Sequence, residues 1–333
     1  LARKATILDS LAQNTENILV VDAGNLFFKK DIIDPGVETD VSKEYAKIIL
    51  ESFNIMGCTV FSPGKKDFAA GKDFLLDLYR DANFPFISAN IYYNDKPIFS
   101  QYHVEEINGI KIAFIGLVSN YNIPGITIKN PIESLKILLN SNQIDADFTV
   151  LLFNSNQEDM RKLYSENLNI DLIIRSNDTK RSPDGGSKIP TYSLGDRGKV
   201  LFSFDINIES LPVSNLVDID WCNNTITRTE TRLDKMRKGN MLIDLEEIYK
   251  GDIATLKRIE KYKNLVNEAS QKLENAINTI SLTKIELGKK INGRLDILQI
   301  VDKGKLNIQD LSGPGLPDHQ GRLPGDPHYQ HGH

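Results

Sequence analysis

Polar side chains that follow short apolar runs are the residues of this sequence best suited to do chemistry. The run NILVVDAG is rich in β-branched residues, closes with a glycine and is followed by Asn25. A carboxylate at such a strand end ligates cations, whereas an asparagine offers an amide oxygen that carries no charge. Asn25 is therefore either part of a polar site or simply the turn former after Gly24.

Further polar groups follow the later apolar runs: Lys65 and Lys66 after CTVFSPG, Asn154 at the end of DFTVLLFN, and Ser176-Asn177-Asp178-Thr179 at the end of IDLIIRS. A protonated lysine repels a cation. At about 4 Å and an effective dielectric of about 20, two unit charges interact by about 4 kcal/mol, and a divalent ion roughly doubles this. With Asn25, the same two ammonium groups favour an anion such as phosphate. The alternative is that both lysines are solvated loop charges and that Asp67 caps the next helix.

Histidine is scarce where catalysis would need it. Of the five histidines, four (His319, His328, His331 and His333) lie near the C-terminal end, and His103 lies in a predicted hairpin, where we expect it to pack or face solvent. Arg175 is predicted to be a surface residue.

The elements that must position these groups are helices alternating with short buried strands, which indicates an α/β fold. The segment YHVEEINGIKIAFIGLVS predicts a hairpin with Asn108-Gly109 at its tip, so the sheet is mixed. Sites in such sheets form at the carboxyl ends of the strands. Helices are predicted over 1–16, 41–57, 71–83, 132–142 and 157–167, and strands over 17–24, 58–64, 84–91, 102–119 (the hairpin), 147–154, 170–176 and, as a pair, 190–208.

In order and spacing, these blocks resemble the 5′-nucleotidase/UDP-sugar hydrolase branch of the calcineurin-like metallophosphoesterases, over roughly residues 1–210. VVDAGNLF is similar to that family's Asp-Ala-Gly-Asp-Leu-Phe block and SPGKKDF to its Gly-Asn-His-Glu-Phe block. LLFN and DLIIRSNDT stand where the family has two histidine motifs, and LGDRGKVL resembles its Gly-x-x-Gly-Lys strand. The resemblance implies a mixed-sheet sandwich with flanking helices. In active relatives it also implies two divalent metal ions and phosphoric ester hydrolysis.

The resemblance also implies that the metal positions are degenerate here. The family's first motif, Asp-x-His, is absent and would precede Leu1, and Asp67 replaces the family's glutamate. We therefore expect no catalytic residue, no bound metal and no other cofactor. The altered positions are Asn25, Lys66, Asn154, Asn177 and Thr179.

Three interpretations of function remain open. The first is a non-catalytic protein that binds a phosphate-containing ligand, such as a nucleotide, through Asn25, Lys65 and Lys66, if these meet at adjacent strand ends with Asn154 and Asn177 nearby. The second is an active metal-dependent phosphoesterase. The third is an interaction scaffold that recruits a partner through a C-terminal helix.

The chain beyond the resemblance is predicted to divide into four parts: an irregular connection with one or two strands over 211–239, a helical extension over 240–290, a short strand or loop over 291–310, and a disordered Gly/Pro/His-rich tail over 311–333. Within the extension, apolar residues from Leu256 to Ile280 recur at helical spacing. This pattern indicates packing within the chain or, as the alternative, a protein partner or self-association through residues 253–285.

Composition and charge bear on which partners and which location the protein has. The net charge of −5 argues against nucleic-acid binding. No apolar run approaches the roughly 20 residues that a transmembrane helix needs. The resemblance implies an extracytoplasmic location, although no signal peptide is visible at Leu1. Cys58 and Cys222 either form one disulfide or stay as buried thiols.

Overall fold

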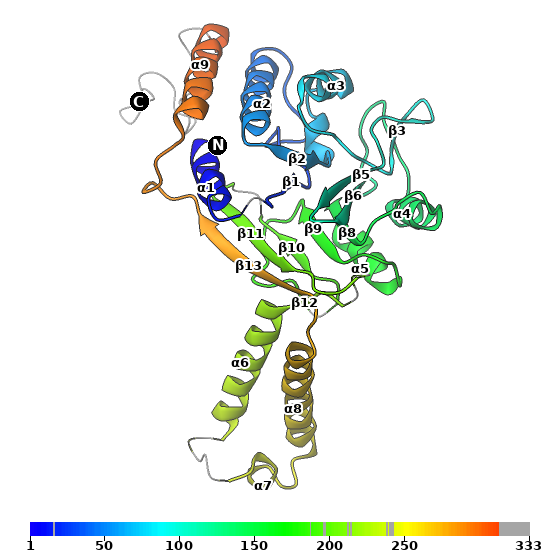
Figure 1. Ribbon diagram of the computed structural model, residues 1–333, viewed down its shortest axis with the longest axis vertical. Coiled ribbons are helices and arrows are strands. Elements are labelled where there is room, and N and C mark those ends of the chain that lie inside the picture. The colour runs from blue at the N-terminus through cyan, green and yellow to red at the C-terminus, as the bar shows by residue number, and fades with distance from the viewer. Residues whose placement is uncertain are drawn as a thin grey trace.

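The framework of the protein is a sandwich of two sheets with helices on its outer faces (Figure 1). The computed structural model describes residues 1–15, 17–186, 188–195, 198–211, 213, 215–237, 239 and 243–312. The five-stranded sheet has the order β10 (Thr191–Ser193), β9 (Leu172–Ser176), β8 (Phe148–Asn154), β6 (Ile110–Val118), β5 (Tyr102–Ile107). The second sheet has the order β11 (Val200–Asn207), β13 (Thr279–Glu286), β12 (Val217–Asp218).

The core between the two sheets is apolar. Phe114, Val150 and Tyr192 of the first sheet pack in one buried cluster with Phe202 and Ile280 of the second. Strands β6, β8, β9 and β10 run parallel, and β5 pairs with β6 in an antiparallel hairpin. The predicted α/β sandwich with a mixed sheet and flanking helices is thereby confirmed.

Two smaller sheets extend the framework. Strands β1 (Val20–Asp22) and β2 (Cys58–Phe61) pair in parallel, and β4 (Lys96–Pro97), β3 (Ile91–Tyr93) and β7 (Thr127–Ile128) form the other sheet. The predicted strand over 84–91 is wrong for most of its length. Only isolated bridges at Phe86 and Ile87 link this segment to Phe61 and Ser100.

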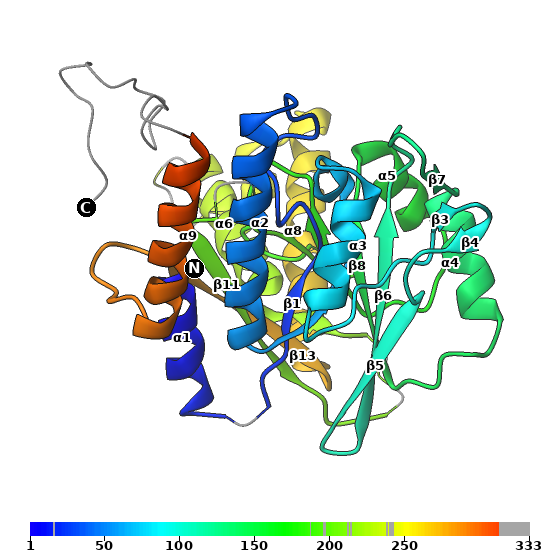
Figure 2. The ribbon, with the colours of Figure 1, turned by 90° about the horizontal axis from the view of Figure 1, so that it is seen from above.

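Helices cover both sides of the framework. Helices α4 (Pro131–Asn140) and α5 (Gln157–Ser165) pack on the five-stranded sheet, where Leu135 and Met160 share a cluster with Leu151. On the other side, α1 (Ala2–Ala12), α2 (Val37–Ile55) and α3 (Lys72–Asp81) cover β2. In Figure 2, α1 and α2 lie next to the C-terminal helix α9.

The residues after 210 differ from the sequence prediction in three places. The predicted irregular connection over 211–239 is mostly helix α6 (Ile219–Met236). Asp218 caps this helix by accepting the Trp221 N–H at 2.8 Å, and packing against α8 (Ile253–Glu274) outweighs the weak helix propensity of its many Thr and Asn residues.

The predicted helical extension over 240–290 contains α7 (Leu245–Ile248) and α8, but the chain then becomes strand β13. Alternating β-branched residues in TISLTKIE favour this strand, which pairs with β11 along its whole length, from Asn207–Thr279 to Val200–Glu286. Within α8, Ile259 and Ala269 are buried, which agrees with packing inside the chain.

The predicted strand or loop over 291–310 is wrong as well, because Leu295–Ser312 forms helix α9. Ile297 is fully buried between α9 and the helices beside it. Gly304 lets α9 approach α2 closely, since a Cβ there would overlap Ile48. The predicted disordered tail lies, from residue 313 on, outside the described residues.

The two cysteines are free and buried, so no disulfide joins Cys58 to Cys222. Burial raises the pKa of both thiols. Within the described part of the chain, no helix is long and apolar enough to cross a bilayer.

The place of β13 in the core gives a first testable prediction. Replacing Ile280 by Ala should lower the free energy of unfolding by about 2–5 kcal/mol, because the side chain is fully buried between the sheets. Thr283→Ala on the exposed part of β13 is the control and should cost at most about 1 kcal/mol. Urea denaturation measures both values, and equal losses in the two variants would contradict this placement of β13.

Candidate functional site

The groups singled out by the sequence meet around Gly64, where β1, β2 and β8 end. We call this set (Asn25, Gly64, Lys65, Lys66 and Asn154) the Gly64 junction. A Cβ at Gly64 would lie 2.5 Å from Asn154 Nδ2 and 2.7 Å from Asn25 Oδ1, so the two amide side chains close over this glycine from either side. The structure thus brings together four polar residues that the sequence placed at separate strand ends.

Asn25 serves as both a turn former and a polar side chain. Its φ of 62° is left-handed, a conformation that asparagine tolerates better than most residues. Gly24 before it has a φ of 102°, and a Cβ there would meet Gly64 N at 2.5 Å. Asn25 Oδ1 accepts the backbone N–H of Lys66 at 3.0 Å.

Asn154 makes the matching contact from β8. It is fully buried, its Oδ1 accepts the Lys65 N–H at 3.3 Å, and its Nδ2 donates to Ser176 Oγ at 2.6 Å. The Ser176 hydroxyl in turn donates to the Ala23 carbonyl at 2.5 Å. The amides of Asn25 and Asn154 therefore bind the first two N–H groups of the 3-10 turn η1 (Lys65–Phe68).

Asp67, a residue of the same turn, fixes it through backbone hydrogen bonds. Its two carboxylate oxygens accept three backbone N–H groups, from Asn25 at 2.7 Å, Gly64 at 2.8 Å and Phe27 at 2.9 Å. The prediction that Asp67 caps the next helix is wrong, because α3 begins after Gly71 and has no side-chain cap. Asp67 instead accepts the Gly64 N–H at the start of η1. Burial raises the pKa of Asp67 from 3.8 to about 7, because complete desolvation outweighs the three donors that oppose the shift.

Lys65, one of the two lysines predicted to face a shared anion, already has an acidic partner. Lys65 Nζ forms an ion pair with Asp31 and lies 5.5 Å from the centre of the Tyr121 ring. Its side chain is 34% exposed, and its charge already has a counter-ion. Lys66 is half-buried at the same turn.

The other predicted positions lie at the end of β9. Asn177 is exposed, has a φ of 65° and donates from Nδ2 to the Tyr121 hydroxyl at 2.8 Å, so Tyr121 connects it to Lys65. Thr179 is exposed and lies in the loop beside Gly195.

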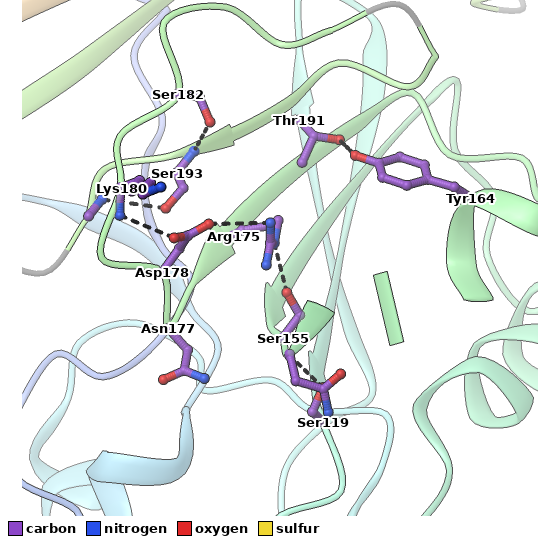
Figure 3. A network of polar contacts seen from close by, with 12 residues as sticks. Ser119, Ser155, Tyr164, Arg175, Asn177, Asp178, Lys180, Ser182, Thr191 and Ser193 are labelled. Atoms are coloured by element: carbon purple, nitrogen blue, oxygen red, sulfur yellow. Dashed lines mark hydrogen bonds and ion pairs between the residues drawn. The ribbon is translucent and has the colours of Figure 1, made fainter. Parts of the chain in front are cut away.

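Arg175 was wrongly predicted to be a surface residue, because its side chain is only 11% exposed. It donates from Nε to Ser155 Oγ at 2.8 Å and lies 3.5 Å from Asp178 Oδ2 (Figure 3). The signal in the sequence was its place within a buried strand, three residues before an aspartate. His103, on β5, contacts Glu105 at 2.6 Å.

The Gly64 junction does not fit a pair of divalent metal ions. The amide oxygens of Asn25 and Asn154 and both oxygens of Asp67 already accept backbone N–H groups. Lys65 and Lys66 stand where the family resemblance implies one metal ligand and one phosphate-contacting acid. A dinuclear centre needs imidazoles and charged carboxylates, one of them bridging. Among the described residues, no group of three or more His, Cys, Asp or Glu side chains is arranged to hold a metal ion.

Comparison with known proteins agrees with this fold. The calcineurin-like phosphoesterase YfkN of Bacillus subtilis matches with a TM-score of 0.63 at 15% identity, over 94% of this chain and 90% of that chain. The putative 5′-nucleotidase of Staphylococcus aureus matches with a TM-score of 0.56 at 16% identity, over 65% of this chain and 47% of that chain. This chain has the calcineurin-like phosphoesterase fold.

Sequence comparison leads to the same superfamily. A 5′-nucleotidase of Vibrio cholerae is 29% identical in an alignment over 151 residues. The alignment covers 41% of this chain and 26% of that protein. This chain thus matches about a quarter of the curated relative, and about half of the Staphylococcus aureus chain. No family model matches the sequence. The assignment to the 5′-nucleotidase-like, calcineurin-like phosphoesterases made from the motif blocks is confirmed at the level of the superfamily.

The raised pKa of Asp67 predicts a pH dependence of stability. Because the folded-state pKa of about 7 exceeds the unfolded value of 3.8, the native state binds more protons between these values. Stability from this group is complete below about pH 4 and is lost as the pH rises to about 7. The slope of unfolding free energy against pH reports the difference in bound protons between the native and unfolded states. Asp67→Asn should reduce this difference by up to one proton in this window. Other buried carboxyls leave a residual slope, and parallel curves for the two proteins would contradict the prediction.

The closeness of the amides to Gly64 predicts a packing penalty. Gly64→Ala should lower the free energy of unfolding by about 1–3 kcal/mol, because the new methyl group must displace Asn25 or Asn154. Gly288→Ala is the matched control: nothing lies within 4 Å of its added Cβ. That variant should stay within about 0.5 kcal/mol of the wild type. Chemical denaturation compares the three proteins, and a neutral Gly64→Ala would show that the amides do not close over this glycine.

Proposed function

We propose that this chain is a non-catalytic protein built on the 5′-nucleotidase-like phosphoesterase fold. The observation that carries the proposal is that Asn25 and Asn154 direct their amide oxygens to the N–H groups of Lys66 and Lys65. In an active dinuclear hydrolase, the corresponding strand ends hold cations that activate water and stabilise the leaving oxygen. Here the same strand ends bind each other, and the junction contributes neither a histidine acid nor a metal-held hydroxide.

An active metal-dependent phosphoesterase is the alternative. Its support is the shared fold and the partial match to a 5′-nucleotidase, and a fold alone is a weak warrant for an activity. The same relationship supports an extracytoplasmic location as part of the proposal, since the family resemblance implies export.

The anion-binding alternative at Asn25, Lys65 and Lys66 stays a prediction, and two contacts weigh against it. Asp31 neutralises Lys65, and the amide of Asn25 is occupied by a backbone donor. An anion would have to displace Asp31 before it gained the full charge of both lysines. The scaffold alternative would use residues 253–285, most of which lie in α8, one side of the helical hairpin that projects from the sandwich (Figure 1).

The donor set at the Gly64 junction predicts the metal content. Protein that lacks residues 313–333, and with them four histidines, should carry no stoichiometric Zn, Mn or Fe by elemental analysis after exposure to each ion. The full-length chain is the control for weak binding by the histidines of the tail. Two ions per truncated chain would contradict a degenerate site.

The same donor set predicts the absence of turnover. Hydrolysis of AMP, UDP-glucose and p-nitrophenyl phosphate should equal that of buffer, and added Mn²⁺ or Co²⁺ should not change it, because the residues of the Gly64 junction offer no group that activates water or protonates the leaving oxygen. The Asn25→Ala variant separates true activity from a contaminant. Turnover that survives repeated purification of the wild type and disappears in the variant would favour the active alternative.

A further inference from the structure

The helical hairpin formed by α6, α7 and α8 carries a pocket that the proposed function does not use. Its volume is about 310 Å³, which is at the lower end of small-ligand sites. Three cationic side chains line it, Arg232 and Lys235 from α6 and Arg258 from α8. Tyr262, Tyr249 and Met236 provide apolar and aromatic surface between them.

Some basic residues of the hairpin have acidic partners, whereas the three cations that line the pocket have none among the ion pairs of the described residues. Arg237 pairs with Asp234, Lys263 with Glu246, and Arg228 lies 4.0 Å from Asp184. Within the described part of the chain, no ion pair involves Arg232, Lys235 or Arg258. Three like charges in one pocket repel one another, which is unusual in a chain whose net charge is −5.

Contacts with neighbouring side chains hold two of the three cations, Arg232 and Arg258. Arg232 lies with its guanidinium 5.9 Å from the centre of the Tyr262 ring, a cation–π arrangement. Arg258 donates to Thr255 Oγ1 at 3.3 Å. Thr255 donates its own hydroxyl proton to Asp252 at 2.7 Å, and Asp252 is the N-cap of α8. The hydrogen bonds from Thr255 lower the pKa of Asp252, and the charge of Arg258 adds to this lowering.

Phosphate is the anion that this arrangement suits. Guanidinium groups bind phosphate oxygens in pairs, and an ammonium group adds a point charge. The volume leaves room for a phosphate with a small organic group, which the tyrosine rings would contact. We propose that the pocket between α6, α7 and α8 binds the phosphate of a small soluble phosphoester or of a lipid headgroup. This proposal does not depend on the Gly64 junction.

Calorimetry on the full chain tests the proposal with inorganic phosphate and with glycerol 3-phosphate. Flotation with phosphatidylcholine vesicles, with and without phosphatidylglycerol, tests the lipid source. Arg232→Ala and Arg258→Ala should each weaken binding by about tenfold, because each removes a charge-assisted contact. Arg258→Lys keeps the charge but loses the paired donors, so it should weaken binding less than Arg258→Ala.

Two controls separate this pocket from general charge effects. Lys257→Ala removes a neighbouring exposed charge of α8 that does not line the pocket, and Lys65→Ala/Lys66→Ala removes the charges of the Gly64 junction. Neither should change the affinity. Binding only to phosphatidylglycerol vesicles, or only to the soluble esters, supports the proposal and identifies the source. No binding of any probe, equal weakening by Lys257→Ala, or weakening only by the Lys65/Lys66 variant would overturn it.

Discussion

The arrangement of this phosphoesterase fold at its strand ends depends on the contact between two asparagine amides and the backbone of one turn. Asn25 and Asn154 reach η1 from different strands and accept the N–H groups of Lys66 and Lys65. Only a glycine fits between the two amides, and Gly64 occupies that position. β1, β2 and β8 are thereby held together by neutral hydrogen bonds, where a shared pair of metal ions would hold them in a dinuclear hydrolase.

The neighbouring polar groups follow from this constraint. Asp67 belongs to the same turn, and its carboxylate accepts three backbone N–H groups, which explains why a fully buried carboxyl is retained there. Ser176 extends the contacts of Asn154 to the Ala23 carbonyl and so ties β9 to β1. The amide oxygens of Asn25 and Asn154 and both carboxylate oxygens of Asp67 accept backbone N–H groups. For this reason we propose a structural role for the junction instead of catalysis.

The sequence predicted the part of the fold whose elements show their own periodicity. The alternation of buried runs and helices up to residue 208, the Asn108-Gly109 hairpin and the meeting of Asn25, Lys65 and Asn154 follow from pattern and strand order. Helix α6 was missed because Thr and Asn residues have weak helix propensity and packing against α8 decides its state. Strand β13 was missed because its partner, β11, lies about 75 residues earlier, and no local pattern records such a pairing.

The claim that the Gly64 junction is held by amide hydrogen bonds instead of metal ions is tested by a crystal structure. The crystals are grown in Mn²⁺, and the data are collected at the manganese absorption edge. We expect no anomalous peak between Asn25 and Asn154, and we expect both amide oxygens to keep their bonds to the N–H groups of Lys66 and Lys65. An anomalous peak within ligand distance of either amide oxygen, with η1 displaced from the junction, would contradict it.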